Sequence, residues 1–157
     1  MPSPRESLQA ELEINRTAFQ KLIAALSEAD LRGPSENPAW SVREILHHTV
    51  LSLEVVPGGA WVAQHNSPLL NVPQWLYDPI NIVITRVGAL GQTRASMLRR
   101  YEAAHLKALA CLQNIRDEEW QKTLHYFYLT PTVAELFHRQ ALHLAEHTTQ
   151  LQQQFLK

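Results

Sequence analysis

The sequence has little cysteine, no long apolar run and no concentration of charge of one sign. Its single cysteine, Cys111, excludes an intrachain disulfide framework and fits a reducing compartment. Because no run of about 18 apolar residues occurs, we expect no transmembrane helix. The net charge is −1 without a basic block, so nothing indicates a nucleic acid or a membrane surface as partner. The N-terminus lacks the basic head and apolar run of a signal peptide, and we therefore expect a soluble cytoplasmic protein.

What the sequence does contain is typical of a globular helical protein. Hydrophobic residues make up 45% of its 157 residues, a length that fits one domain over residues 1–157. Capping boxes, in which Ser or Thr precedes Glu by three positions, mark three helix starts: Ser3 with Glu6, Ser41 with Glu44, and Thr132 with Glu135. Apolar residues at helical spacing predict helices over residues 4–30, 42–56, 78–90, 94–115 and 133–155. We interpret Cys111, inside the fourth of these, as a small core residue.

One segment departs from this pattern. Residues 60–77 are irregular, with two prolines and two tryptophans, and Pro57-Gly58-Gly59 just before them is expected to break or kink the second helix. A loop of that length is either functional or caps one end of the core. Four long amphipathic helices and no convincing strand predict an all-α four-helix bundle, with a loop insertion containing proline and tryptophan after the second helix.

Histidines on the second and the last helix are the candidate functional residues. His143 and His147 lie four residues apart, about 40° apart around the helix, so both rings can reach one divalent cation. The pair alone is a weak signal in a chain with 8 histidines. His48 lies at the margin of the apolar stripe of its helix and can face inward, whereas His47 lies about 100° further round, on the solvent side. In a bundle, His48 and the pair can converge on one metal ion.

The other polar candidates have simpler interpretations. His105 has no partner at metal-ligand spacing and is interpreted as a packing or surface residue, and His138 projects to the opposite side of the last helix. Glu44 and Gln140 lie about one turn before the candidate ligands, near enough to contact them. The capping box already explains Glu44, and Gln140 fits an ordinary residue at the edge of its helix.

Three imidazoles leave a fourth coordination position open, which is the arrangement of catalytic rather than structural metal sites. Zinc and nickel are the favoured ions for such a site, and iron, cobalt and manganese are alternatives. The metal would lower the pKa of a bound water or hold a thiol as the more nucleophilic thiolate. We therefore expect a small-molecule substrate, while the sequence identifies no catalytic residue beside the ligands.

The order and spacing of these residues also match a known pattern. A tryptophan, Trp40, precedes a capped helix; His48 follows eight positions later; and a late H-x-x-x-H, His143 and His147, is followed by Gln150. In these features the chain resembles the DinB superfamily. The resemblance implies a metal-binding four-helix bundle, often a homodimer, with the three histidines as ligands. It also implies kinship with transferases that use a low-molecular-weight thiol such as bacillithiol or mycothiol.

The sequence is compatible with two functions. The first is a metal-dependent enzyme, a thiol transferase or a hydrolase, acting through His48, His143 and His147. The second is a non-catalytic, stress-associated binding bundle whose metal is structural or vestigial, or whose histidines merely pack. A third interpretation, the H-x-x-E-H motif of inverted zinc peptidases, is excluded because no Glu, Asp or His follows His147 to supply the further ligand.

Overall fold

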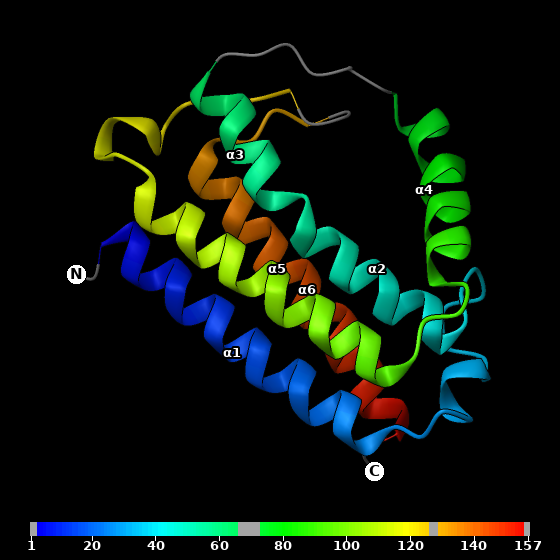
Figure 1. The fold of residues 1–157 in the computed structure, drawn as a ribbon. Coiled ribbons are helices and arrows are strands. Elements are labelled where there is room, and N and C mark those ends of the chain that lie inside the picture. The colour runs from blue at the N-terminus through cyan, green and yellow to red at the C-terminus, as the bar shows by residue number, and fades with distance from the viewer. Residues whose placement is uncertain (1–2, 66–72, 126–128, 156–157) are drawn as a thin grey trace.

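The computed structural model describes residues 3–65, 73–125 and 129–155, which contain helices, turns and isolated bridges but no β-strand (Figure 1). The elements in chain order are α1 (Pro4–Ala25), the 3-10 turn η1 (Asp30–Arg32), α2 (Val42–Glu54), α3 (Val56–Gln64), α4 (Gln74–Ala89), α5 (Arg94–Asn114), the 3-10 turn η2 (Asp117–Glu119) and α6 (Val133–Phe155). The predicted all-α fold is confirmed. Within the described ranges, no helix is both long and apolar enough to cross a membrane.

The helices α1, α2, α5 and α6 form a four-helix bundle. α1 packs against α5 and α6, and α2 packs against the same two helices. α3 continues beyond the end of α2, where it contacts α5 and α6 (Figure 1). The core includes the stacked rings of Phe19 and Tyr101, whose centroids are 4.0 Å apart. Asn15 Nδ2 donates to Ala141 O at 2.8 Å, and this buried bond fixes α1 against α6.

The capping boxes form as the sequence predicts. Ser41 Oγ accepts a hydrogen bond from the backbone N–H of Glu44, and Glu44 Oε2 accepts one from the backbone N–H of Ser41 at 2.6 Å. Ser3 and Thr132 make the equivalent reciprocal bonds at the starts of α1 and α6. These bonds satisfy backbone donors that lack a partner in the first helical turn, so each helix begins at the predicted position.

The end of the first helix was predicted too late. α1 ends at Ala25 rather than near Asp30, because Leu26 takes an extended conformation. The carboxylate of Asp30 instead accepts hydrogen bonds from the backbone N–H and the hydroxyl of Ser27, both at 2.7 Å. This local network favours a turn over continued helix, since Ser and Asp side chains compete with the helical backbone.

The predicted loop insertion is also partly wrong. The expected break is present, since α2 ends at Glu54 and α3 begins at Val56. Pro57, Gly58 and Gly59 nevertheless lie inside α3, with Pro57 in its first turn, where a missing N–H needs no acceptor. Gly59 packs beneath Leu136 of α6, where a Cβ atom would come within 2.9 Å of Leu136 Cδ2. α4 begins at Gln74, earlier than predicted. Of the expected loop, residues 66–72 lie outside the described ranges.

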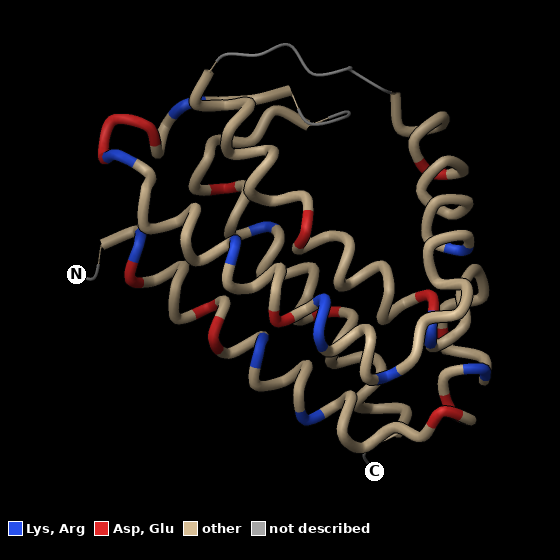
Figure 2. The backbone as a smooth tube through the Cα atoms, viewed as in Figure 1, with Lys and Arg blue, Asp and Glu red and all other residues tan. Residues whose placement is uncertain are grey.

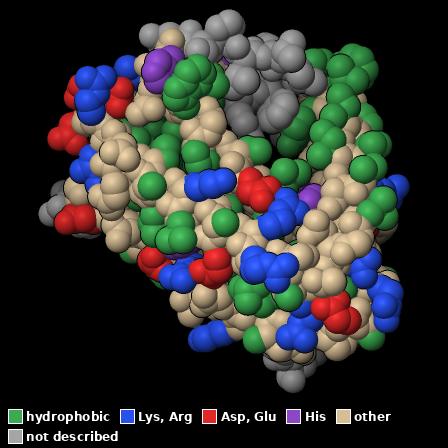
Figure 3. All heavy atoms as spheres, viewed as in Figure 1, with side chains coloured by type: hydrophobic (Ala, Val, Ile, Leu, Met, Phe, Trp, Pro, Cys, Tyr) green, Lys and Arg blue, Asp and Glu red, His purple; other side chains and the backbone are tan. Residues whose placement is uncertain are grey.

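α4 lies beside the bundle against α2, and its outer side is apolar. Figure 2 shows charged residues spread along the bundle helices α1, α2, α5 and α6, whereas α4 carries only two, Asp78 and Arg86. Figure 3 shows a column of apolar side chains along this helix. The exposed large apolar residues of α4 and its C-cap are Trp75, Leu76, Ile80, Val83, Ile84, Val87 and Leu90. The buried side of the same helix is formed by Thr85 and Ala89.

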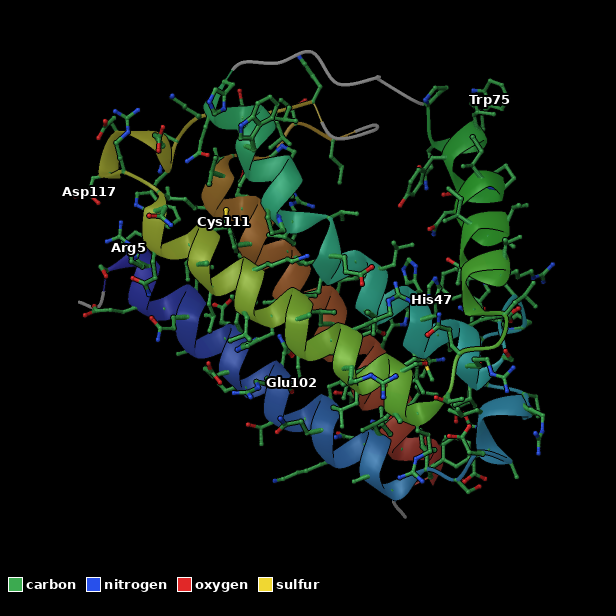
Figure 4. The ribbon with its side chains drawn as sticks, viewed as in Figure 1. Arg5, His47, Trp75, Glu102, Cys111 and Asp117 are labelled. Atoms are coloured by element: carbon green, nitrogen blue, oxygen red, sulfur yellow. The ribbon has the colours of Figure 1, made fainter. Side chains whose placement is uncertain are left out.

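The prediction that His47 faces solvent is wrong. His47 is only 3% exposed, because α4 covers the side of α2 on which it lies (Figure 4). Its Nδ1 accepts a hydrogen bond from Arg100 Nη1 at 3.0 Å, and Arg100 also binds both carboxylate oxygens of Glu54. Gly88 of α4 lies directly against the imidazole, where a Cβ atom would collide with Nε2. The wheel of α2 alone contained no information about this second covering helix.

The predictions for three other side chains agree with the structure. His105 is fully buried in α5, and its Nε2 lies 3.0 Å from Glu13 Oε1, in agreement with a packing role. His138 projects away from the other α6 histidines and pairs with Glu11. Cys111 is half-buried against the core, and burial raises the pKa of its thiol, which does not favour a nucleophilic role.

Replacement of Gly88 by Ala tests the close contact between α4 and α2. We expect the Gly88→Ala variant to lower the free energy of unfolding by about 1–3 kcal/mol, because the added methyl group must displace the buried His47 ring. Gly58→Ala is the matched control, since a Cβ atom at Gly58 meets nothing within 4 Å. The control should gain about 0.5–1 kcal/mol through helix propensity. Equal unfolding midpoints of the two variants in urea would contradict the contact.

Candidate metal centre

Three histidine rings meet where α2 faces α6. His48 comes from α2, while His143 and His147 come from successive turns of α6, and one ring nitrogen of each lies within 4.8 Å of the other two. The Nε2 atoms of His48 and His143 are 2.9 Å apart. The ring centroid of His147 lies 5.4 Å from that of His48 and 4.5 Å from that of His143. The structure thus brings together the three histidines that the helical wheels place inward.

Two neighbours hold the ring of His48. Trp40, just before the helix cap, packs against it with ring centroids 4.6 Å apart and an interplanar angle of 38°. On the other side, Thr85 Oγ1 of α4 lies 3.5 Å from His48 Nδ1 and is fully buried. A hydroxyl that accepts from Nδ1–H leaves the Nε2 lone pair directed at the other two histidines.

The environment keeps these imidazoles neutral at pH 7. Burial, followed by the proximity of His143 and His147, lowers the pKa of His48 to about 3. Burial and then His147 lower the pKa of His143 to about 4. Burial also lowers the pKa of His147, although Gln150, one turn further on, opposes this shift without reaching hydrogen-bonding geometry. A neutral imidazole is the form that binds a metal, so protons compete little for these rings.

The donor set fits a divalent cation. Both ring nitrogens of His147 are buried, and neither has a hydrogen-bond partner among the described residues. Buried polar atoms are normally satisfied, and a cation shared by the three rings would satisfy one of these nitrogens. Ligand nitrogens in a tetrahedral zinc site lie about 3.3 Å apart, so the 2.9 Å between His48 and His143 needs only a small separation.

Comparison with known proteins agrees with this arrangement. A family model described as the DinB superfamily matches residues 11–151, which include all three histidines. The chain belongs to the DinB superfamily. No curated protein matches it in sequence.

Solved structures with a similar fold are also known. The crystal structure of the mycothiol-dependent maleylpyruvate isomerase superimposes with a TM-score of 0.76, and so does that of a variant of this isomerase with a histidine replaced by alanine. The sequences are 10% identical, so the likeness concerns the fold alone. The alignment covers 96% of this chain but 61% of the isomerase, so the present chain spans less than two thirds of that enzyme.

A cavity of about 420 Å³ opens beside the histidines of this DinB protein. His48, His143 and His147 all border it, together with residues of α4 and of the segment before α6. Polar side chains facing it from α4 include Asp78 and Asn81. This volume suits a small molecule and not a macromolecule.

The two other polar residues that the sequence places near the ligands, Glu44 and Gln140, differ in whether they line the cavity. Glu44 is engaged in the capping box, as expected, and does not line the cavity. Gln140 does line it, and its buried Nε2 has no hydrogen-bond partner in the described structure. The sequence interpretation missed Thr85 and the cavity side of α4. A signal was available: Asp78, Asn81 and Thr85 form a polar row at i, i+3 and i+7 on an otherwise apolar helix.

Proposed function

We propose that His48, His143 and His147 bind one divalent metal ion, and that the protein is a metal-dependent enzyme which activates a thiol or water for reaction with a small molecule. The observation that carries this proposal is the convergence of three neutral imidazoles on one point at the wall of a cavity. Three protein ligands leave a coordination position for a substrate atom, as in catalytic rather than structural sites.

Zinc or nickel is the favoured ion, and when bound it would stabilise a thiolate or hydroxide at neutral pH. The chain's own residues would prepare the site. Thr85 orients the His48 ring through Nδ1, Trp40 covers one face of that ring, and burial keeps the imidazoles unprotonated. His47 takes no part, since its Nδ1 accepts from Arg100.

A low-molecular-weight thiol is the favoured nucleophile. The isomerase with the same fold is named for its dependence on mycothiol, which makes thiol chemistry a precedent for this architecture. The cavity is large enough for part of such a thiol beside an electrophile. We place the protein in the reducing cytoplasm, where small thiols persist.

Metal content tests the proposed ligands. Protein purified without a histidine tag should contain about one divalent ion per chain by inductively coupled plasma mass spectrometry. The His147→Ala variant should lose the ion, because two ligands seldom retain it. His138→Ala is the matched control on the same helix, since His138 pairs with Glu11 outside the cluster. Equal loss of metal from both variants, or its absence from the unaltered protein, would refute the site.

An activity screen tests the enzymatic role. The metal-loaded protein is mixed with mycothiol, bacillithiol or glutathione and a panel of small electrophiles, and thiol consumption is followed. We expect turnover with at least one pair and a loss of at least about a hundredfold in His147→Ala. A protein that binds metal but leaves every pair unreacted would instead favour a non-catalytic binding bundle, the alternative function.

We further propose a homodimer formed through the outer side of α4. Leu76, Ile80, Val83, Val87 and Leu90 follow one another at spacings of four, three, four and three residues, the repeat of a helix–helix seam. Each is exposed, and no acid or base interrupts the row. Pairing two copies about a twofold axis would bury on the order of 1,000 Å², the lower limit for a specific interface.

Analytical ultracentrifugation tests this interface. The unaltered protein should sediment as a dimer that dissociates on dilution, whereas Val83→Glu should be monomeric, because two carboxylates would be buried near the twofold axis. Leu106→Glu is the control, since Leu106 is an exposed apolar residue of α5 outside the α4 row. If Val83→Glu sediments like the unaltered protein, the copies do not pair through α4.

A further inference from the structure

Beyond the histidines, α6 presents a basic residue to the same cavity. Arg139, His143 and His147 are spaced at i, i+4 and i+8, so they form one row along the helix, and all three line the cavity. Successive members of the row are separated by about 6 Å along the helix axis. Arg139 therefore lies one turn from the histidine cluster, at the rim of the cavity.

A buried nitrogen donor on this wall lacks an acceptor among the described residues. Gln140 Nε2 is buried without a hydrogen-bond partner there, and its side chain lines the cavity. Arg139 beside it is exposed, and no described side chain bonds its guanidinium. It attracts Glu135, one turn earlier, but the carboxylate of Glu135 accepts the backbone N–H of Thr132. Unsatisfied buried donors are uncommon, and they indicate a missing acceptor.

We infer that Arg139 and Gln140 form a carboxylate-binding subsite, so that the small molecule held at this site carries a carboxylate at one end and its reacting group at the three histidines. The inference rests on the proposed function for the reacting end. The subsite itself consists of side chains that need no metal to bind a carboxylate.

The charges around the cavity favour a carboxylate over a phosphate dianion. Among the residues that the structure describes, Arg139 is the single cationic side chain other than histidine that lines it, and Asp78 faces it from α4. A singly charged carboxylate pairs with one guanidinium in a planar, two-point geometry. A dianion would meet the additional repulsion of Asp78. Leu129, Pro131 and Leu136 supply an apolar lining that can accommodate a short carbon chain.

A matched pair of thiols tests the subsite in the cobalt(II)-loaded protein. 3-Mercaptopropionate and its neutral amide, 3-mercaptopropanamide, have the same length and the same thiol, and their binding is followed by the thiolate-to-cobalt absorption band. The carboxylate should bind about tenfold more tightly, as expected for a charge-assisted hydrogen bond. In Arg139→Gln the preference should fall below about threefold while the Kd of the amide is unchanged. Arg99→Gln, at an exposed arginine that does not line the cavity, should retain the preference.

Equal binding of the two thiols, or an unchanged preference in Arg139→Gln, would overturn the subsite while leaving the metal centre intact. Failure to load cobalt would count against the proposed function alone, because a second measurement addresses the subsite without metal. In the metal-free protein, 3-mercaptopropionate should shift the side-chain amide resonances of Gln140, assigned with Gln140→Leu, and the shift should be lost in Arg139→Gln. Gln140 resonances that do not respond to the carboxylate overturn the inference.

Discussion

The contact between α2 and α6 is the constraint on which the functional region depends. It brings together one ring from α2 and two from α6, and burial is the main cause of the lowered pKa of all three histidines. Three protonated imidazoles could not occupy this space, because each would be desolvated beside two like charges. The packing of the bundle therefore selects the neutral form, whose lone pairs are available to a metal.

α4 forms one side of the cavity beside this contact. It brings Thr85 to His48 Nδ1 and adds Asp78 and Asn81 to the cavity, while Gly88 allows it to approach His47 closely. The same helix leaves an apolar row on its outer side, whereas the bundle helices α1, α2, α5 and α6 carry charged residues along their length (Figures 2 and 3). This one helix thus covers one face of α2 and carries the apolar row proposed to pair with a second copy.

Several buried polar atoms along the cavity wall have no hydrogen-bond partner among the described residues. Native interiors leave few buried polar atoms without a partner, yet among the described residues His147, Gln140 and Trp40 all have such atoms around one cavity. Away from the cavity such atoms occur singly, on Arg43, His105 and Gln154. Unsatisfied groups that gather at one cavity are the usual sign of a site whose partner is a ligand, because the cost in stability is recovered on binding.

The sequence by itself determined where the bundle helices begin and which faces of α2 and α6 turn inward. Capping boxes and apolar periodicity are local, so Ser41 and Glu44 position the start of α2, and with it the direction of His48, without tertiary information. Tertiary structure decided what lies against those faces. The burial of His47, the contact of Thr85 with His48 and the close packing of Gly59 beneath Leu136 each depend on a segment distant in sequence. Periodicity describes the face of one helix but not the neighbour that covers it, because that neighbour is chosen by packing of the whole chain.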